Sequence, residues 1–508
     1  MGTNMDEQKH EKAHKRDHRP TECGRETRVA IIGTGLAGLT TAYLLDHDKQ
    51  NRFAVTLFEQ AKALSLDAAS LTMVHENTGI RERVDIPPRS FCRGYYDNLC
   101  RMYDYLGIQF QQISLIWIFA TASTTAASET PSPKGAEMMS GSYFIYGKGW
   151  DGLRLLWRHF WCKGTRQILE TFYLVFCHVW FYACCLLVKP RVVRQKAKVV
   201  SDSSLKNPSV CEESLGDYLQ RIRLSQWYMR KYLLPVVSAI CSCPHAEALD
   251  FPASDITGFV KGSFRQKFFV NKDGINRVQS RLSEGIKDAR LHARVLKVHP
   301  VDGKVLVRWQ WTEDGSDQIL EELFDRVVLA VAPNIAASIF DQSKPMLSKI
   351  PTASIINSLL ASPSESISVV QERDHIPAGQ CTYRGGDIQT MVFRTNFSAN
   401  IVESEALHYL PSGVIIKTSS LAGGDESRAV LYAVEFPRTL RTVESRSITD
   451  MIRGESRRQC DESSEAWYSG RDNVWVAGSW CWDGLVLLEG CVVSAMRVAR
   501  DFDVEIPW

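Results

Sequence analysis

The feature that most constrains the fold is a glycine-rich stretch, VAIIGTGLAG at residues 29–38, followed 21 residues after its last glycine by Glu59. The apolar pattern predicts a buried strand over residues 28–32, a helix over 36–45 and a second strand over 54–58 that ends on this acid. A βαβ unit of this kind binds dinucleotides. The alternative is a glycine turn in an unrelated α/β protein.

Each glycine of this stretch has a mechanical role. Gly33 makes the tight turn, Gly35 lets the backbone approach a pyrophosphate, and Gly38 lets the helix pack closely against the strand. The helix begins at Leu36 and Ala37, where unpaired N–H groups and a partial positive charge favour phosphate groups.

The acid after the second strand completes the predicted site. Glu59, with Gln60 next to it, is placed to accept hydrogen bonds from the ribose hydroxyls of an adenosine. The whole arrangement therefore predicts a site for an adenine dinucleotide.

Length, charge and cysteine content narrow the class of protein. A chain of 508 residues holds two or more folding units, and a formal net charge of +2 predicts no nucleic-acid partner. The 14 cysteines include no CxxC pair and no signal-peptide-like stretch precedes the glycine motif, which favours free thiols and a cytoplasmic location. Cys241, Cys243 and His245 have no second ligand pair, so we predict no metal site.

Three segments look irregular in the sequence. Residues 1–27 are polar and lack apolar periodicity, which predicts a disordered tail. Residues 121–140 and 199–213 are rich in small and polar residues and predict surface loops.

An unusually apolar segment, TFYLVFCHVWFYACCLLV at residues 171–188, lies between these loops. As a helix its 18 residues would span about 27 Å, slightly less than the hydrocarbon core of a bilayer. Three interpretations stay open: a buried core helix, a transmembrane anchor, and a helix that dips into one leaflet. Basic residues at both ends favour the last of these. The basic residues are Arg154, Arg158, Lys163 and Arg166 before the segment and Lys189, Arg191, Arg194, Lys196 and Lys198 after it.

Further strands are predicted in the second half of the chain. Residues 290–298 alternate like a strand and pair with 304–311 across a turn. Residues 324–331 (FDRVVLAV) and 473–477 (NVWVA) are apolar runs typical of strands buried on both faces. A helix follows over about residues 488–500.

These segments, in this order, resemble the FAD-dependent amine oxidase and phytoene desaturase superfamily, and most closely its flavin-containing amine oxidoreductase-like proteins. The glycine stretch is similar to the first FAD signature of the family. The family's following region, which contains a long helix, resembles residues 84–89 and 95–107. The family's DRVVLAxxP strand resembles residues 324–333. Residues 476–495 (VAGSW, then LEGC and SA) resemble the last FAD signature.

The resemblance implies FAD as cofactor and adds contacts to it. Val295 stands where a valine of the family meets the adenine through its backbone. Gly478 and Ser479 would contact the ribityl phosphate part of FAD. Amides at the start of the final helix would bind the flavin pyrimidine carbonyl, which gives three further contact residues, Glu489, Gly490 and Cys491.

The sequence also departs from the family pattern. The superfamily usually has a double glycine soon after the ribose-binding acid, whereas residues 64–70 read LSLDAAS. Ser65 or Ser70 would then supply the contacts of this loop. Catalytic residues are not evident. As candidate substrate contacts we name Asp85, Arg89 and Trp480, each with a structural alternative.

The sequence therefore predicts an α/β fold with a discontinuous FAD/NAD(P)-binding Rossmann-like domain and an α+β substrate domain. The expected domains are 28–90, 262–340 and 441–508 for FAD, and 91–261 and 341–440 for substrate. The resemblance implies an FAD-dependent oxidoreductase that oxidises or desaturates a small metabolite by hydride transfer to flavin N5. The apolar segment 171–188 suggests that this metabolite is apolar. Two alternatives are a flavin-dependent isomerase or cyclase without net redox change, and a non-catalytic flavin-binding protein at a membrane. The oligomeric state is left open.

Overall fold

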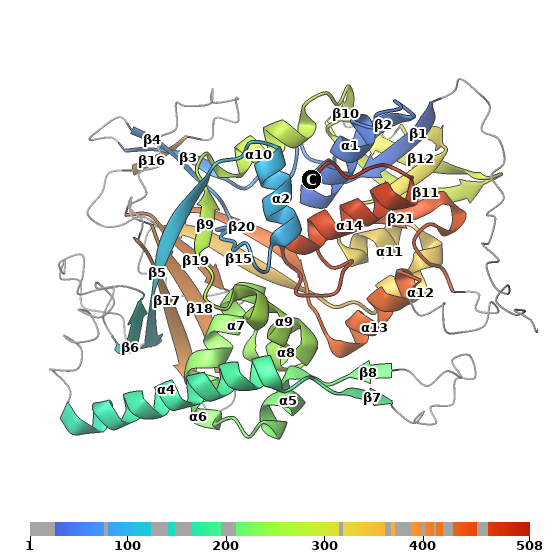
Figure 1. The fold of residues 1–508 in the computed structure, drawn as a ribbon. Helices are drawn as coiled ribbons and strands as arrows, with labels where there is room; N and C mark the ends of the chain where they lie inside the picture. The colour runs from blue at the N-terminus through green and yellow to red at the C-terminus, as the bar shows by residue number, and fades with distance from the viewer. Residues whose placement is uncertain are drawn as a thin grey trace, which may run out of the picture.

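The structure is a computed structural model, and two bodies of secondary structure make up its visible outline (Figure 1). One surrounds a parallel sheet with α1 and α14, and the other is a large mixed sheet with a group of helices below it. Residues 1–25 of the predicted tail (1–27) lie outside the described residues, whereas Thr27 begins the first strand. The structure describes residues 26–75, 80–122, 141–147, 164–194, 210–313, 318–360, 367–370, 388–397, 402–410, 413–419, 430–454 and 466–508.

The parallel sheet has five strands in the order β10-β2-β1-β14-β21. Its central strands are mainly apolar and buried toward their carboxyl ends, because both faces are covered there. Its strands are β10 (Asp288–Arg290), β2 (Phe53–Phe58), β1 (Thr27–Ile32), β14 (Arg326–Leu329) and β21 (Val474–Val476). They come from all three segments expected to build the FAD domain.

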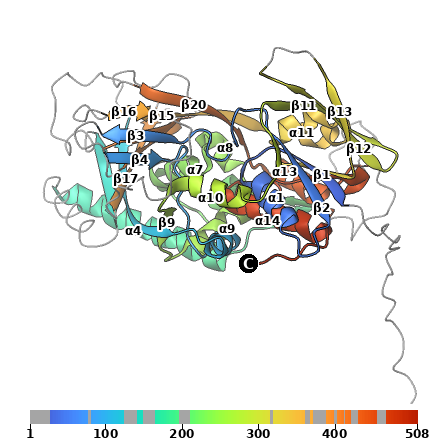
Figure 2. The ribbon, with the colours of Figure 1, turned by 90° about the horizontal axis from the view of Figure 1, so that it is seen from above.

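Alternate residues of β1 face two different cores. Val29 and Ile31 pack under α1 (Leu36–Asp46) and α14 (Leu488–Asp501). Ala30 and Ile32 pack on the other side, in a cluster that includes α11 (Pro333–Ile339), α13 (Val443–Ile452) and a three-stranded sheet. That sheet is β11 (Ala293–Val301), β12 (Lys304–Trp311) and β13 (Leu320–Phe324), and Figure 2 shows it beyond α11.

Two predicted strands divide differently in the structure. The run 324–331 is not one strand, because Phe324 ends antiparallel β13 and residues 326–329 form parallel β14. The run 290–298 is likewise split, since β10 joins the parallel sheet and β11 begins at Ala293. The chain changes sheet at each break, and a uniformly apolar pattern carries no mark of that change.

The large mixed sheet has the order β20-β15-β19-β18-β17-β5-β6, and β9 also pairs with β5. A smaller sheet, β16-β3-β4, lies nearby in Figure 1. Strands β3, β4 and β9 fall within the predicted FAD segments, but β3 pairs with β16 and β9 with β5, both outside those segments, and β4 pairs with β3. The bounds are β3 (Leu71–His75), β4 (Ile80–Val84), β5 (Phe110–Thr121), β6 (Ser142–Gly147), β9 (Phe268–Asn271), β15 (Thr352–Leu360), β16 (Ile367–Val370), β17 (Ile388–Phe397), β18 (Val402–Tyr409), β19 (Ile415–Ser419) and β20 (Val430–Thr439).

A layer of helices packs against one face of this sheet. Their buried side chains form one cluster with Phe119 of β5, Phe393 of β17 and Ala406 of β18. The longest of these helices, α4, lies at the edge of the molecule in Figure 1. The helices of the layer are α4 (Gly164–Leu187), α5 (Leu215–Arg221), α6 (Gln226–Tyr228), η1 (Met229–Leu233), α7 (Leu234–Cys241), α8 (His245–Leu249) and α9 (Ala253–Ser263).

A buried cluster of charges links the two bodies. The Asp255 carboxylate of α9 accepts a hydrogen bond from Arg446 Nη1 of α13 at 2.8 Å, and Arg441 Nε lies 3.5 Å from it. Arg441 is 1% exposed and donates from Nη2 to the carbonyl oxygens of Trp480 and Trp482 at 3.0 Å. The cluster therefore fixes the loop after β21 against both bodies.

Two buried histidines make the stability of the chain depend on pH. His245 Nε2 lies 2.9 Å from Ser404 Oγ, and His408 Nε2 lies 2.8 Å from Gln389 Oε1. Burial lowers the pKa of each histidine to about 4. Each folded-state pKa is thus below the value near 6.5 of an unfolded chain.

The unfolded chain therefore binds more protons than the folded chain between about pH 6.5 and pH 4. We expect each histidine to remove about 2–3 kcal/mol from the free energy of unfolding as pH falls through this window. Urea unfolding at a series of pH values measures the slope. His408→Gln should flatten it, and an equally steep slope in this variant would contradict the assignment.

Candidate functional site

The glycine turn after β1 has the close contacts that a dinucleotide motif requires. Gly33 has φ +100°, and a Cβ there would lie 2.6 Å from the Ala330 carbonyl oxygen. A Cβ at Gly38 would lie 2.0 Å from the Gly33 carbonyl oxygen. At Gly35 a Cβ would meet nothing within 4 Å. Gly33 and Gly38 are thus needed by the fold itself, whereas Gly35 borders open space.

The acid at the end of β2 faces this turn. Ile32 and Phe58 are paired in register, so the turn after β1 and Glu59 begin at the same level of the sheet. Glu59 Oε2 accepts a hydrogen bond from Thr34 Oγ1 at 2.6 Å, and Oε1 accepts one from the Ala61 amide at 3.0 Å. Gln60 is exposed beside it. Glu59 therefore occupies the place of a ribose-binding acid.

Two helices begin at this edge without a side-chain cap. Helix α1 begins at Leu36 after Gly35, and α14 begins at Leu488 after Leu487, and neither capping residue makes a side-chain hydrogen bond. Uncapped N-terminal amides carry partial positive charge and bind anions and carbonyl oxygens. Both helices can therefore serve as cofactor-binding ends.

The two ends of the chain meet here, as the sequence predicts. Gly478 follows β21 and is joined to α14 by hydrogen bonds with Ser494 Oγ at 2.9 and 3.1 Å. The Cys491 thiol interacts with the Ala37 backbone and the Ser479 side chain, and burial raises the pKa of this thiol to about 11. The start of α14 therefore lies against the start of α1.

The side chain of Glu489 binds another helix of the protein. Its carboxylate accepts hydrogen bonds from the Asn98 amide at 3.0 Å, from Asn98 Nδ2 at 2.7 Å and from the Leu99 amide at 3.0 Å, at the start of α2 (Asp97–Tyr105). Burial raises the pKa of this carboxyl. A cofactor contact at Glu489 thus falls to its backbone.

Gly490 allows a close approach at the start of α14. A Cβ there would lie 2.4 Å from the Ser479 carbonyl oxygen and 2.3 Å from Cδ1 of Trp482. The Trp482 ring also lies 5.8 Å from the ring of Tyr95, whose hydroxyl accepts a hydrogen bond from the Leu485 amide at 3.1 Å. The loop after β21 therefore folds back onto α14.

Val295 lies beside the ribose-binding edge. It is buried in the same cluster as Ile32 and Phe58. The register between β11 and β12 shifts directly after it, between Val295 and Lys297. The nearby Ala293 amide donates to the Glu59 carbonyl oxygen at 2.8 Å. This position agrees with an adenine contact.

The three candidate substrate residues differ in their surroundings. Asp85 accepts from the Ile275 amide at 3.0 and 3.1 Å and so caps α10 (Gly274–Ser283). Trp480 is buried, and its Nε1 donates to the Val331 carbonyl oxygen at 3.2 Å. These contacts within the fold account for both Asp85 and Trp480. Arg89 Nη2 donates to the Leu66 carbonyl oxygen at 3.1 Å, but its buried Nη1 has no hydrogen-bond partner among the described residues.

Arg89 lies close enough to Cys491 to lower the pKa of its thiol, against the stronger effect of burial. An orphaned buried donor at this edge is what a site for an anionic or carbonyl-bearing group would contain. Of the three candidates, Arg89 is thus the one with a free donor at the site.

The loop that lacks the double glycine reaches the turn through side chains. The Ser65 amide donates to Thr34 Oγ1 at 2.8 Å, and the two hydroxyls are 3.2 Å apart. Ser70 Oγ instead accepts from the Ile86 amide at 3.4 Å. Ser65 therefore contacts the site through Thr34, whereas Ser70 supports the neighbouring loop.

Sequence reasoning missed several residues of this site. Thr34 lies between two named glycines, and its hydroxyl links Glu59 to Ser65. Its place inside the motif was the available signal. Tyr95 and Arg441 reach the site only through tertiary packing, and the sequence holds no comparable signal for them. Trp482 was predictable as a stacking candidate, because it is an aromatic residue directly after the last strand.

A parallel sheet whose first strand ends in this glycine turn, with an acid after the second strand, defines a Rossmann-like dinucleotide-binding protein. A model of the NAD(P)-binding Rossmann-like domain matches residues 31–106, and a model of the flavin containing amine oxidoreductases matches residues 226–502. The chain belongs to the flavin containing amine oxidoreductase family. This confirms the resemblance and the fold class, and membership implies a flavin cofactor.

Solved structures share the fold at low sequence identity. A CLA-producing fatty acid isomerase from P. acnes has a TM-score of 0.54 and 13% identity, covering 95% of this chain and 100% of that one. An oxidoreductase from Methanosarcina mazei has a TM-score of 0.51 and 12% identity, covering 93% and 100%. A putrescine oxidase bound to putrescine has a TM-score of 0.50 and 14% identity, covering 95% and 100%. No curated protein matches the chain significantly in sequence.

Two glycine substitutions separate the needs of the fold from those of a cofactor. Gly38→Ala should lower the free energy of unfolding of the cofactor-free protein by about 2–3 kcal/mol, because its Cβ meets a backbone oxygen. Gly35→Ala should change it by less than about 0.5 kcal/mol but abolish retention of FAD, because its Cβ enters the open space. Urea unfolding and flavin absorbance measure the two effects. Equal destabilisation by both variants would contradict this division.

Proposed function

We propose that this chain is an FAD-dependent oxidoreductase acting on a small, apolar metabolite. One observation carries the proposal. The turn Gly33–Gly38 and the uncapped start of α14 lie together at the edge of one parallel sheet, although they are far apart in the sequence. A single extended cofactor with a diphosphate in its middle accounts for both helix ends, whereas a nicotinamide dinucleotide leaves the start of α14 without a role.

The residues present fit FAD. Glu59 and Thr34 would hold the adenosine ribose, and the open space at Gly35 with the amides of α1 would hold the diphosphate. The amides of α14 would bind the pyrimidine carbonyl and stabilise negative charge on the reduced ring. Arg89 Nη1, which has no partner among the described residues, would donate to this same flavin part of the cofactor.

A flavin held by these residues would supply a hydride acceptor, N5, for a substrate carbon next to nitrogen, oxygen or an unsaturated carbon. The side chains of the protein would orient the substrate and exclude water from it. Tyr95 packs against Phe259 with ring centroids 4.8 Å apart and against Trp482 at 5.8 Å. Such an aromatic wall orients an apolar substrate and excludes water.

A second candidate is an isomerase or cyclase that uses the flavin without net redox change. The fold likeness to a fatty acid isomerase is the observation in its favour. A non-catalytic flavin-binding protein is the third reading, because the double glycine of the superfamily is missing. The mass of the product separates the first two, and substrate-dependent bleaching excludes the third.

The direct test is the absorbance spectrum of the purified chain. We expect a flavin spectrum, and a heat-released cofactor that co-migrates with FAD rather than FMN. Anaerobic addition of an amine, a fatty acid and a terpenoid should identify a substrate that bleaches it, with a product two hydrogens lighter. A colourless protein that does not bind added FAD would overturn the proposal, and a product of unchanged mass would favour the isomerase.

Arg89 gives a test at the level of one side chain. Arg89→Gln should weaken FAD binding tenfold or more, because a hydrogen bond to a charged group contributes about 1.5–3 kcal/mol. Flavin fluorescence quenching on titration of the cofactor-free protein measures the affinity. Arg308→Gln, at an exposed arginine paired with Glu321, is the control and should bind FAD normally. Unchanged affinity in Arg89→Gln would remove this residue from the site.

A further inference from the structure

Helix α4 presents an apolar face to solvent along its length. Among the described residues, its segment Ile168–Leu187 is the one helix long and apolar enough to cross a membrane, and 28% of that segment is buried. Five side chains spaced by three, four or eight positions are 60% to 83% exposed, namely Leu169, Phe172, Phe176, Val179 and Leu187. We call them the apolar stripe. A surface helix of a soluble protein normally turns polar residues outward.

Two polar side chains of α4 have partners on the body of the protein. His178 Nδ1 lies 2.9 Å from Tyr228 Oη, and Glu170 interacts electrostatically with Tyr232. Leu174, Cys177 and Phe181 are buried on the same side. The helix is therefore packed on the body of the protein along one side from Leu174 onward, which distinguishes it both from a core helix and from a helix that stands free in a bilayer.

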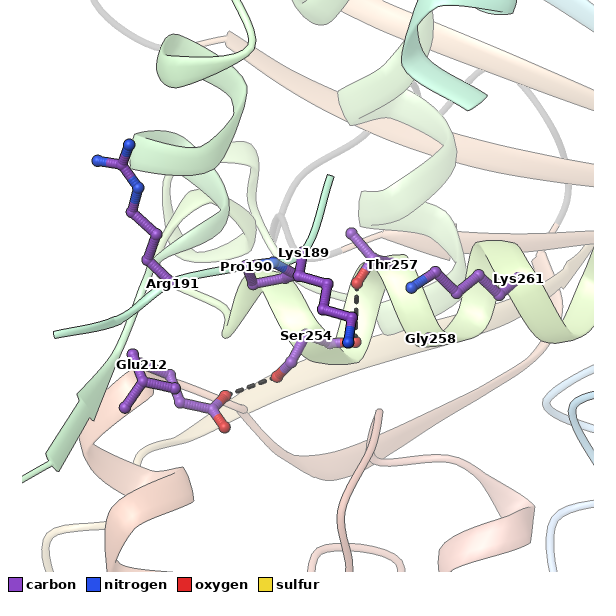
Figure 3. Close-up of a pocket in the computed structure, with 9 residues that line it drawn as sticks. Lys189, Pro190, Arg191, Glu212, Ser254, Thr257, Gly258 and Lys261 are labelled. Carbon is purple, nitrogen blue, oxygen red and sulfur yellow. Dashed lines mark hydrogen bonds between the residues drawn. The ribbon is translucent and has the colours of Figure 1, made fainter. Parts of the chain in front are cut away.

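Cationic side chains gather at the C-terminal end of the stripe. A cavity of about 300 Å³ there is lined by Lys189, Arg191 and Lys261, with Glu212 as the acid among its lining residues. Ser254 donates its hydroxyl to Glu212 at 2.6 Å. Figure 3 shows Lys189 and Lys261 reaching toward Ser254 and Thr257, while Arg191 is directed away from them.

Two further features of this end suit a lipid–water interface. Trp180 is half exposed and donates from Nε1 to the Ile222 carbonyl oxygen at 2.9 Å, so its ring faces outward and its polar group is satisfied. The exposed Phe264 packs on Tyr182 at 5.7 Å and is followed by the exposed Arg265. Amphipathic aromatic residues next to cations are typical of helices that lie in a membrane surface.

We infer that α4 docks this protein on an anionic phospholipid membrane, with the apolar stripe in the acyl boundary and Lys189 and Lys261 on headgroup phosphates. The charge next to the stripe favours a bilayer over a second copy of the chain, because two copies would bring like charges together. The inference does not depend on the flavin, so its test is separate from that of the proposed function.

The test is flotation of the whole chain with vesicles of phosphatidylcholine alone or mixed with phosphatidylserine. We expect binding that is stronger on the mixed vesicles. Phe172→Ser with Phe176→Ser should weaken it about tenfold for each Phe. Lys189→Ala with Lys261→Ala should weaken it about fivefold for each cation on the mixed vesicles only, because a basic residue at an anionic surface contributes about 1 kcal/mol.

Ile319→Ser is the matched control, because Ile319 is 55% exposed outside α4. It should bind vesicles normally, and thermal unfolding should confirm that all variants are folded. Absence of vesicle binding by the unaltered chain would overturn the inference, as would binding that the Phe variant leaves unchanged. A dimer that the Phe variant dissociates, without vesicle binding, would assign the stripe to a second copy instead.

Discussion

The carboxyl ends of β1, β14 and β21 lie side by side, and the candidate cofactor contacts at the starts of α1 and α14 depend on this alignment. Ile32 pairs with Leu329, and Leu329 with Val476, so the turns that follow reach the same edge. A shift of one residue would turn each buried side chain to the other face, which both cores forbid. Contacts that exclude a Cβ, at Gly38 and Gly490, then hold α1 and α14 close to this edge.

The rest of the chain supports that edge from a distance. The buried charges around Asp255 fix the loop after β21, and Glu489 joins α14 to α2. Both interactions link residues far apart in the sequence. The aromatic group around Tyr95 closes the same region from the side of the helical layer, while α4 lies away from the parallel sheet (Figure 1). The molecule thus separates the cofactor edge from its exposed apolar face.

The local motif made the first part of this site predictable. Glycines, a helix start and an acid lie within one βαβ unit, so their spacing in sequence fixes their spacing in the structure. The final helix could be placed only by resemblance, since no local pattern says which sheet edge it joins. The change of sheet at residue 325 and the capping role of Glu489 were missed, because partners distant in sequence decide both. The exposure of α4 was likewise open, since apolar periodicity does not tell a core face from a lipid face.

The central claim is that both ends of the chain bind one flavin dinucleotide. A crystal structure of the chain purified with FAD tests it most directly. The account predicts diphosphate density against Gly35 and the start of α1, with the ring system at the start of α14 and the adenosine near Glu59. Density for the cofactor at any other edge of the sheet would contradict it, and so would a diphosphate and a flavin ring that contact only one of the two helices.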